Sequence, residues 1–562
     1  MLEQDAPESG APDNHATVWE AISDAIPDAD ALVQGDRHVA WRALDDRAAR
    51  LAGAFASLGV GAGTHTALYL RNCPEYVESL AACLKLRAVA ANVNPLYLAR
   101  EVAQIVDNAD AEVVVYHRSL GAHVAAALPS LPRVHAIVEV DDGSDAPPVD
   151  GALRFEELIA THDPAPRIPR SGTDHLLWYT GGTTGTPKGV LWEQQTLLRS
   201  GYTYGTGLLG RDAPATVAEA ARAATALDEE DRRLVTLVTT PLAHATAANQ
   251  LHLTLAHGGT LVLLPVGPVD GDAICRTVER EHVRLLSIVG TVVLPRIVTA
   301  LLRADERGSP YDISSLWRVH ASGAISSAAA KDALHRYAPQ VSFYDALGAS
   351  EGVGFGVSLT TTVGEASTAR FRLGPNARVL DSDDRDVVPG SGEPGVLAVT
   401  ESTGIGYHKD PERTAATFRL IDGRRYAVLG DWAVLHTDGT ITLLGRGSGC
   451  INTGGEKVWP EEVEEALKTH PAVVDAVVVG LPDEEWGESI AAVVSLRDGD
   501  TATDDGSPDV PGTGDPSPGE LGEWVATRLA RYKRPRRVEI VDEVVRTPVG
   551  KPDYEWARAQ LN

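Results

Sequence analysis

Residues 180–189 have the composition of a loop that binds a polyphosphate. Their sequence is Thr-Gly-Gly-Thr-Thr-Gly-Thr-Pro-Lys-Gly, so four glycines, four threonine hydroxyls and one lysine lie within ten residues. Glycines let backbone N–H groups approach phosphate oxygens, hydroxyls donate hydrogen bonds, and Lys188 supplies positive charge. On these residues alone, a phosphate-binding loop and a flexible surface turn are both open.

The surroundings of this loop limit the kind of nucleotide site it could form. An apolar run at residues 176–179 precedes it and is typical of the end of a buried strand. A Walker A loop needs Lys directly after Gly, and Ser or Thr directly after Lys. Here Pro187 precedes Lys188 and Gly189 follows it. The spacing therefore excludes a Walker A nucleotide site.

Composition predicts a large globular protein that does not bind nucleic acid. The 562 residues, 43% of them hydrophobic, exceed what one core can hold, so we expect at least two domains. A net charge of −28 argues against nucleic acid or an anionic membrane as the main partner. No apolar run approaches the ~20 residues of a membrane span, and the acidic N-terminus is unlike a signal peptide. The four cysteines have no CxxC or metal-ligand spacing, which predicts a cytoplasmic protein.

Short apolar runs alternate with helical patterns along the chain, which predicts an α/β fold. Residues 234–240 form a β-branched run that Pro241 ends, and residues 261–264 are typical of a buried strand. We expect helices to begin at Asp45 and at Pro460, because proline and the acidic residues after it suit the first turn of a helix.

Composition also predicts where the domains divide. We expect residues 1–14 to be a disordered tail and residues 498–520, which almost lack apolar side chains, to be a flexible loop. The Gly-Ser-Gly stretch at residues 447–449 supplies flexible backbone between two strand-like segments, so a domain border and a simple hairpin are both open there. We expect an N-terminal domain over residues 15–447 and a C-terminal domain over residues 448–562.

The loop at residues 180–189 resembles, at every position, the phosphate-loop signature of the adenylate-forming superfamily. This superfamily contains acyl-CoA synthetases, luciferases and non-ribosomal adenylation domains. The resemblance extends over about residues 72–551, with the motifs in the family's order, and residues 450–462 are closest in form to synthetases of fatty and sterol-derived acids. It implies a large N-terminal domain of layered α/β sheet subdomains and a small, mobile C-terminal α+β domain.

Two motifs supply the carboxylates that the resemblance implies. Residues 344–351, Tyr-Asp-Ala-Leu-Gly-Ala-Ser-Glu, resemble the motif that ends in a magnesium ligand, here Glu351. Ser350 would contact the α-phosphate or the acyl carboxylate, and Leu347 stands where many relatives carry an aromatic side chain against adenine. The Gly-Asp-Trp segment around Asp431 resembles the ribose motif, in which the carboxylate accepts hydrogen bonds from both hydroxyls.

Basic residues complete the implied site. Lys551 would reach the acyl carboxylate and the α-phosphate, where its charge stabilises developing negative charge. The permanent positive charge of Arg446 suits contact with the phosphates or the ribose of the nucleotide. Ser448 occupies the position of the family's hinge residue, about which the C-terminal domain turns. His244 resembles the histidine at the mouth of the acyl pocket, and a purely structural role is equally open for it. The expected catalytic residues are Lys551, Glu351, Lys188 and His244. The expected ATP-binding residues are Thr180, Gly181, Gly182, Thr183, Thr184, Gly185, Lys188, Gly323, Ala324, Leu347, Gly348, Ser350, Asp431, Arg446 and Lys551.

The implied activity is that of an AMP-forming acyl-CoA synthetase. A carboxylate attacks the α-phosphate of Mg-ATP to give an acyl adenylate and pyrophosphate, and the CoA thiol then displaces AMP. The expected participants are ATP, Mg²⁺, CoA and a hydrophobic acid of fatty, steroid-like or terpenoid-like type. An acyl-AMP ligase that loads a carrier-protein phosphopantetheine and a non-catalytic nucleotide or acyl binder are the alternatives. The oligomeric state stays open, and a homodimer is compatible with the sequence.

Overall fold

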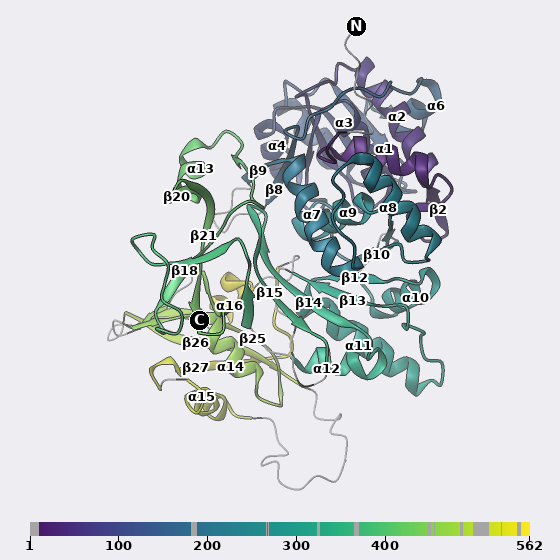
Figure 1. Ribbon diagram of the computed structural model, residues 1–562. Helices are drawn as coiled ribbons and strands as arrows, with labels where there is room; N and C mark the ends of the chain where they lie inside the picture. The colour runs from purple at the N-terminus through teal and green to yellow at the C-terminus, as the bar shows by residue number, and fades with distance from the viewer. Residues whose placement is uncertain are drawn as a thin grey trace.

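The chain folds as a mixed α/β protein with a large N-terminal part and a small C-terminal part (Figure 1). This arrangement confirms the predicted fold class. Among the described residues the strands form three sheets, of 14, 8 and 5 strands. The computed structural model describes residues 10–180, 188–265, 267, 269–322, 326, 328–362, 364, 370–446, 451–453, 456–483, 487–497, 516–529, 531–547 and 552–561.

The largest sheet is parallel in one half and antiparallel in the other. In spatial order its strands are β17 (Ala377–Leu380), β18 (Pro394–Val399), β21 (Arg424–Leu435), β22 (Thr440–Arg446), β16 (Arg370–Leu373), β15 (Gly352–Thr360), β14 (Ser342–Ala349), β13 (Arg318–Ala321), β12 (Leu285–Ile288), β10 (Val235–Val238), β11 (Thr260–Leu263), β1 (Asp30–Gln34) and β2 (Arg37–Ala40), with β20 (Phe418–Ile421) beside β21. The strands from β14 to β1 pair in parallel, whereas those from β14 to β17 pair antiparallel.

Helices cover both faces of the parallel half of this sheet (Figure 1). Parallel strands that are buried on both faces are continuously apolar, which explains the uninterrupted Leu-Val-Leu runs of the sequence. The helices on one face are α7 (Gln194–Leu209), α8 (Val217–Glu229) and α9 (Ala245–Ala256). Those on the other face are α10 (Gly271–Glu281), α11 (Gly290–Glu306) and α12 (Ala328–Tyr337).

The second sheet contains the N-terminal strands and the hairpin that follows them. Its order is β19 (Gly406–Tyr407), β9 (Lys188–Glu193), β8 (His175–Thr180), β4 (Val89–Asn92), β3 (His65–Tyr69), β5 (Ala111–His117), β6 (Ala136–Val140) and β7 (Leu153–Arg154). On one face, α3 (Pro74–Lys85) and α6 (Phe155–Thr161) contact its strands, and α1 (His15–Ala25) and α2 (Trp41–Ser57) share the same hydrophobic core. The other face packs against α4 (Ala99–Asn108) and α5 (Gly121–Ala127). The short helix α13 (Pro411–Thr417) follows β19.

The C-terminal part has its own sheet and its own hydrophobic cores. The sheet order is β24 (Glu456–Val458), β23 (Ile451–Thr453), β26 (Gly487–Leu496) and β25 (Val473–Asp483), with β27 (Arg537–Val541) beside β26. Helices α14 (Pro460–Lys468) and α15 (Pro518–Ala526) pack on one face, and α16 (Tyr554–Gln560) packs on the other. In the described part of the chain, no helix is both long and apolar enough to cross a bilayer.

Several predicted element boundaries agree with the structure, and one is wrong. Strand β10 falls within the predicted segment, β11 begins and ends one residue before its predicted bounds, and α14 begins at Pro460 as expected. Helix α2, however, begins at Trp41 instead of Asp45. The Trp41 side chain is only 1% exposed, so burial of this indole adds a turn that the sequence pattern does not indicate.

The two segments predicted to lack structure are partly ordered. Residues 1–9 lie outside the described part, but Asn14 is buried and its side chain caps helix α1 by accepting from the Thr17 N–H. Residues 498–515 also lie outside the described part. Helix α15 nevertheless begins within the predicted loop, because Ser517 and Glu520 form a capping box.

Candidate active site

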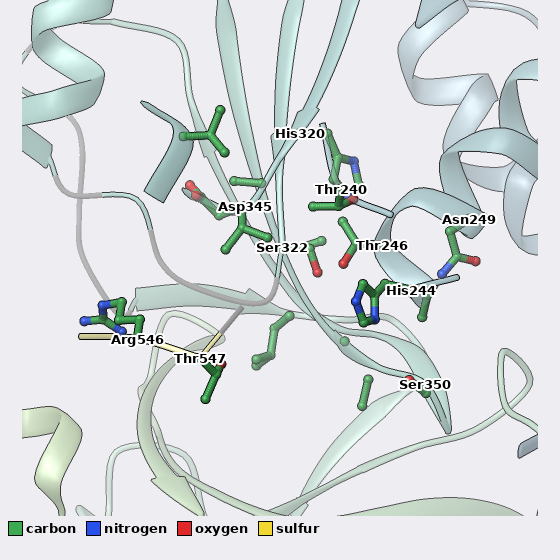
Figure 2. Close-up of a pocket in the computed structure, with 18 of the residues that line it drawn as sticks. Thr240, His244, Thr246, Asn249, His320, Ser322, Asp345, Ser350, Arg546 and Thr547 are labelled. Atoms are coloured by element: carbon green, nitrogen blue, oxygen red, sulfur yellow. The ribbon is translucent and has the colours of Figure 1, made fainter. Parts of the chain in front are cut away.

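One cavity of about 2920 Å³ extends between the largest sheet and the C-terminal part. Its wall includes residues of β8, β9, β13 and β14, of helices α7 and α9, and of α14 and β25. Pockets for one small ligand measure about 300–1,000 Å³, so this cavity has room for more than one substrate. Figure 2 shows His320, Thr246 and Asn249 on one side of the cavity, with Arg546 and Thr547 on the opposite side.

The β8–β9 hairpin holds both ends of the predicted phosphate loop. Thr180 and Lys188 are paired across the two strands, and both line the cavity. The Nζ atom of Lys188 lies 6.0 Å from the centroid of the Tyr407 ring, close enough for the aromatic face to attract a cation. The loop between the paired ends lies outside the described residues, and with it the predicted contacts Gly181, Gly182, Thr183, Thr184 and Gly185.

The turn between β14 and β15 presents Ser350 and Glu351 to the cavity. The Nε1 atom of Trp192 donates to the carbonyl oxygen of Ser350 at 2.8 Å, and the Tyr407 hydroxyl donates to Oε1 of Glu351 at 2.6 Å. Trp192 lies in β9 and Tyr407 in the neighbouring β19. Tyr407 therefore joins the carboxylate of Glu351 and the ammonium group of Lys188 in one cluster.

Sequence reasoning missed Tyr407 and its role in this cluster. Burial of the ring, together with the charge of Glu351, raises the pKa of the Tyr407 hydroxyl, so this side chain remains a proton donor at neutral pH. Tyr407 reaches the site because its two-residue strand pairs with Val190 of β9. The two positions are far apart in the chain, and no local pattern could have shown that they meet.

The predicted ribose contact, Asp431, lines the same cavity from strand β21. It is in register with Arg446 of β22, so these two predicted contacts are cross-strand neighbours. The side chain of Arg446 lies outside the described part. Leu347 and Gly348 line the cavity from β14, and Leu347 also packs against the main hydrophobic core.

His244 is the N-cap residue of helix α9 and lines the cavity. The helix then contributes Ala245 and Thr246 to the wall, and Figure 2 shows the side chains of His244 and Thr246 close to the centre of the site. Small side chains at this end of α9 leave the cavity open. The structure thus brings His244 into the same cavity as Lys188 and Glu351.

The chain on both sides of Lys551 lines the cavity as well. The Arg546 guanidinium donates two hydrogen bonds of 2.6 Å to the carboxylate of Asp475 in β25, and such bidentate pairing fixes orientation. The backbone of Arg546 also forms a bridge with Pro552, which closes the base of the loop that contains Lys551. Thr547 and Pro552 line the cavity, whereas Lys551 itself lies outside the described residues.

The C-terminal part packs against the large part next to the predicted hinge. The backbone φ of Gly445 is +104°, a conformation that other residues rarely adopt, and a Cβ atom there would lie about 2.0 Å from the carboxylate of Glu461, so helix α14 closely approaches β22 at this glycine. The rings of Trp432 and Trp459 are 5.9 Å apart across the same contact. The predicted hinge residue Ser448 lies outside the described part, as do the predicted ATP-binding residues Gly323 and Ala324.

A buried ion pair lies behind the strand that leads to Glu351. The Nζ atom of Lys331 in α12 is 2.5 Å from Oδ2 of Asp345 in β14, and the two residues are 0% and 3% exposed. Burial raises the pKa of the Asp345 carboxyl, and the charge of Lys331 opposes this rise. Asp345 lines the cavity. Sequence reasoning gave Lys331 no role, because one lysine in a helical pattern is normally solvated.

Comparison with known proteins agrees with this geometry. Residues 19–406 match the model of the AMP-binding enzyme family, and residues 462–551 match that of the AMP-binding enzyme C-terminal domain. The chain belongs to the AMP-binding enzyme family, the adenylate-forming enzymes that its motifs resemble. This match, together with the curated CoA ligases described next, confirms the expectation of an AMP-forming acid–thiol ligase.

Curated relatives cover almost the whole chain. The 3-oxocholest-4-en-26-oate–CoA ligase of Rhodococcus rhodochrous is 38% identical over 560 residues, which are 97% of this chain and 96% of that protein. The medium/long-chain-fatty-acid–CoA/3-oxocholest-4-en-26-oate–CoA ligase of Mycobacterium tuberculosis (strain ATCC 25618 / H37Rv) is also 38% identical, with 97% and 96% coverage. These names confirm the resemblance to synthetases of fatty and sterol-derived acids.

Solved structures support the fold. The anthranilate CoA ligase AuaEII in complex with anthranoyl-AMP aligns with a TM-score of 0.79 at 22% identity, covering 100% of this chain and 98% of that one. A benzoate CoA ligase from Burkholderia xenovorans LB400 aligns with a TM-score of 0.77 at 21% identity, covering 98% and 99%.

Proposed function

We propose that the chain activates a hydrophobic carboxylic acid, of fatty or steroid type, as an acyl adenylate and transfers the acyl group to CoA. One observation carries this proposal: a single cavity is lined by Lys188, Glu351, Asp431 and the residues on either side of Lys551. An adenylation site needs groups of these types, because they must contact the triphosphate, the metal ion, the ribose and the reacting carboxylate. The names of the most similar curated relatives support an acid of fatty or steroid type.

Each residue has a distinct proposed role. Lys188 and the loop before it hold the phosphates that leave as pyrophosphate, and Asp431 accepts from the ribose hydroxyls. Ser350 and His244 lie where the acyl carboxylate meets the α-phosphate. Lys551 stabilises the negative charge that develops there, and it does so most strongly when the closed cavity excludes water.

Glu351 fits a magnesium ion that arrives with ATP. Among the residues that the structure describes, no group of three or more His, Cys, Asp and Glu side chains could hold a metal ion. Magnesium in nucleotide-dependent enzymes needs only one or two carboxylates, because phosphate oxygens and water supply the remaining ligands. When bound, the ion would neutralise charge on the phosphates, and Tyr407 would keep the Glu351 carboxylate oriented toward it.

We further propose the division into a domain of residues 15–447 and a mobile domain of residues 448–562 that turns about Ser448. The close approach of Glu461 to Gly445 supports a border here, because the two parts meet beside the proposed hinge. A cytoplasmic location is proposed as well. The described cysteines, Cys73, Cys83 and Cys275, support it because they are free thiols.

The direct test is pyrophosphate release with ATP, Mg²⁺ and a panel of fatty, aromatic, steroid and terpenoid acids. Thioester formation is then measured with free CoA and, separately, with a holo carrier protein. We expect acid-dependent pyrophosphate release and thioester formation on free CoA. Transfer to the carrier protein alone would instead identify an acyl-AMP ligase, and no pyrophosphate release with any acid would overturn the proposal.

A further inference from the structure

The inner part of the cavity has a polar wall where a hydrophobic acid alone would need an apolar one. Successive side chains of a strand point to opposite faces, so Arg318 and His320 of β13 share one face with Ser322 just beyond the strand. All three line the cavity. His320 is two residues deeper than Ser322, which corresponds to about 7 Å along the strand.

Two neighbouring helices bring further polar groups to this depth. The Nδ1 atom of His320 is 3.2 Å from Nε2 of Gln250 in α9 and 3.3 Å from the hydroxyl of Tyr204 in α7. Gln250 is 3% exposed and His320 is 8% exposed, and both line the cavity with Tyr204. Burial lowers the pKa of His320 to about 4, so at neutral pH its ring is uncharged and Nδ1 accepts hydrogen bonds from these two donors.

One polar atom of this cluster remains unsatisfied. The Oε1 atom of Gln250 is buried and has no hydrogen-bond partner among the described residues. A buried amide oxygen without a partner is costly, and such atoms are uncommon in native proteins. Apolar side chains, among them Leu253, Val289 and Val293, line the same cavity. A buried acceptor on the cavity wall that has no partner among the described residues fits a ligand that carries one hydrogen-bond donor at this depth.

We propose that Gln250 selects acids that carry a hydroxyl group beyond their apolar segment, and that this hydroxyl donates to Gln250 Oε1. The inference rests on the proposed function, because the same cavity must admit the acid. A keto group would not satisfy this atom, since it can only accept. A fully apolar acid would leave the amide oxygen buried and unpaired.

The test compares each hydroxy acid with the acid in which a methyl group replaces the hydroxyl. The probes are ω-hydroxyhexanoate with heptanoate, ω-hydroxyoctanoate with nonanoate, and para-hydroxycinnamate with para-methylcinnamate. The quantity measured is the ratio of kcat/KM values within a pair, followed by pyrophosphate release. Since both acids are measured on one preparation, loss of folded protein does not change the ratio.

In the Gln250→Leu variant we expect the ratio to shift about tenfold toward the methyl acid for the pairs that reach Gln250, as loss of one buried hydrogen bond predicts. Gln194→Leu is the matched control. Gln194 is also a buried glutamine, but it contacts His15 and lies outside the cavity wall. This control should leave every ratio as in the unmodified protein.

Equal ratios in the unmodified protein and in Gln250→Leu, for every pair that is turned over, would overturn the inference and leave the proposed function standing. A preference for suberate over ω-hydroxyoctanoate would also overturn the inference. Such a preference would show that the deep end of the cavity binds a carboxylate through the positive charge of Arg318. No turnover of any acid would remove the proposed function and this inference together.

Discussion

Removal of the Lys331 side chain should destabilise the large domain far more than loss of an ordinary lysine. The charges of Lys331 and Asp345 lie 2.5 Å apart, and both residues are fully or almost fully buried. At an effective dielectric constant of about 20, their attraction is about 7 kcal/mol. Desolvation of the two ions offsets much of this attraction, but Lys331→Met removes only one partner. The remaining buried carboxylate should lower the free energy of unfolding by about 3–5 kcal/mol.

The assay is urea unfolding followed by tryptophan fluorescence, with two comparison variants. Lys409→Met removes an ammonium group that is 42% exposed and paired with Asp110, so it should cost at most about 1 kcal/mol. The double variant Lys331→Met/Asp345→Asn removes both charges and should recover most of the lost stability. If Lys331→Met costs no more than Lys409→Met, the pair is not ionic and the reasoning fails.

Two further predictions concern the cluster around Glu351 and the buried histidine His15. Tyr407→Phe removes the 2.6 Å hydrogen bond to Glu351 and should raise the Mg²⁺ concentration for half-maximal pyrophosphate release about tenfold; an unchanged Mg²⁺ dependence would refute this orienting role. Burial lowers the pKa of His15 to about 3, below the unfolded value near 6.5. As the pH falls, His15 is therefore protonated in the unfolded chain before it is protonated in the folded chain. The contribution of His15 to stability is complete above pH 6.5 and is lost as the pH falls toward 3. Relative to His15→Gln, the free energy of unfolding should fall by up to about 1.4 kcal/mol per pH unit in that window, and parallel pH profiles would contradict it.

The order of motifs predicted the family and several residues of the cavity wall. Thr180, Lys188, Ser350, Glu351 and Asp431 were all expected, and they line one cavity. The roles proposed for them rest on phosphate, metal and ribose chemistry, which requires particular side chains at particular strand ends. All the required side chains lie within short motifs, so the sequence is sufficient to find these residues.

The supporting residues could not be predicted in the same way. Tyr407 meets Glu351 only because β19 pairs with β9, and Lys331 meets Asp345 only because α12 packs behind β14. Such contacts depend on the tertiary arrangement, and no local spacing encodes them. The start of helix α2 at Trp41 has the same cause, since burial of one indole decides it.

The most direct test of the adenylation site separates the two half-reactions in the Lys551→Ala variant. We predict that this variant loses acid-dependent pyrophosphate release by at least about a hundredfold, as loss of one electrostatic contact to the transition state implies. It should still form the thioester from supplied acyl adenylate and CoA at nearly the rate of the unmodified protein. Lys409→Ala, outside the cavity wall, should leave both steps intact. Equal loss of both half-reactions in Lys551→Ala, or full retention of pyrophosphate release, would contradict the assignment of this cavity as the site of adenylation.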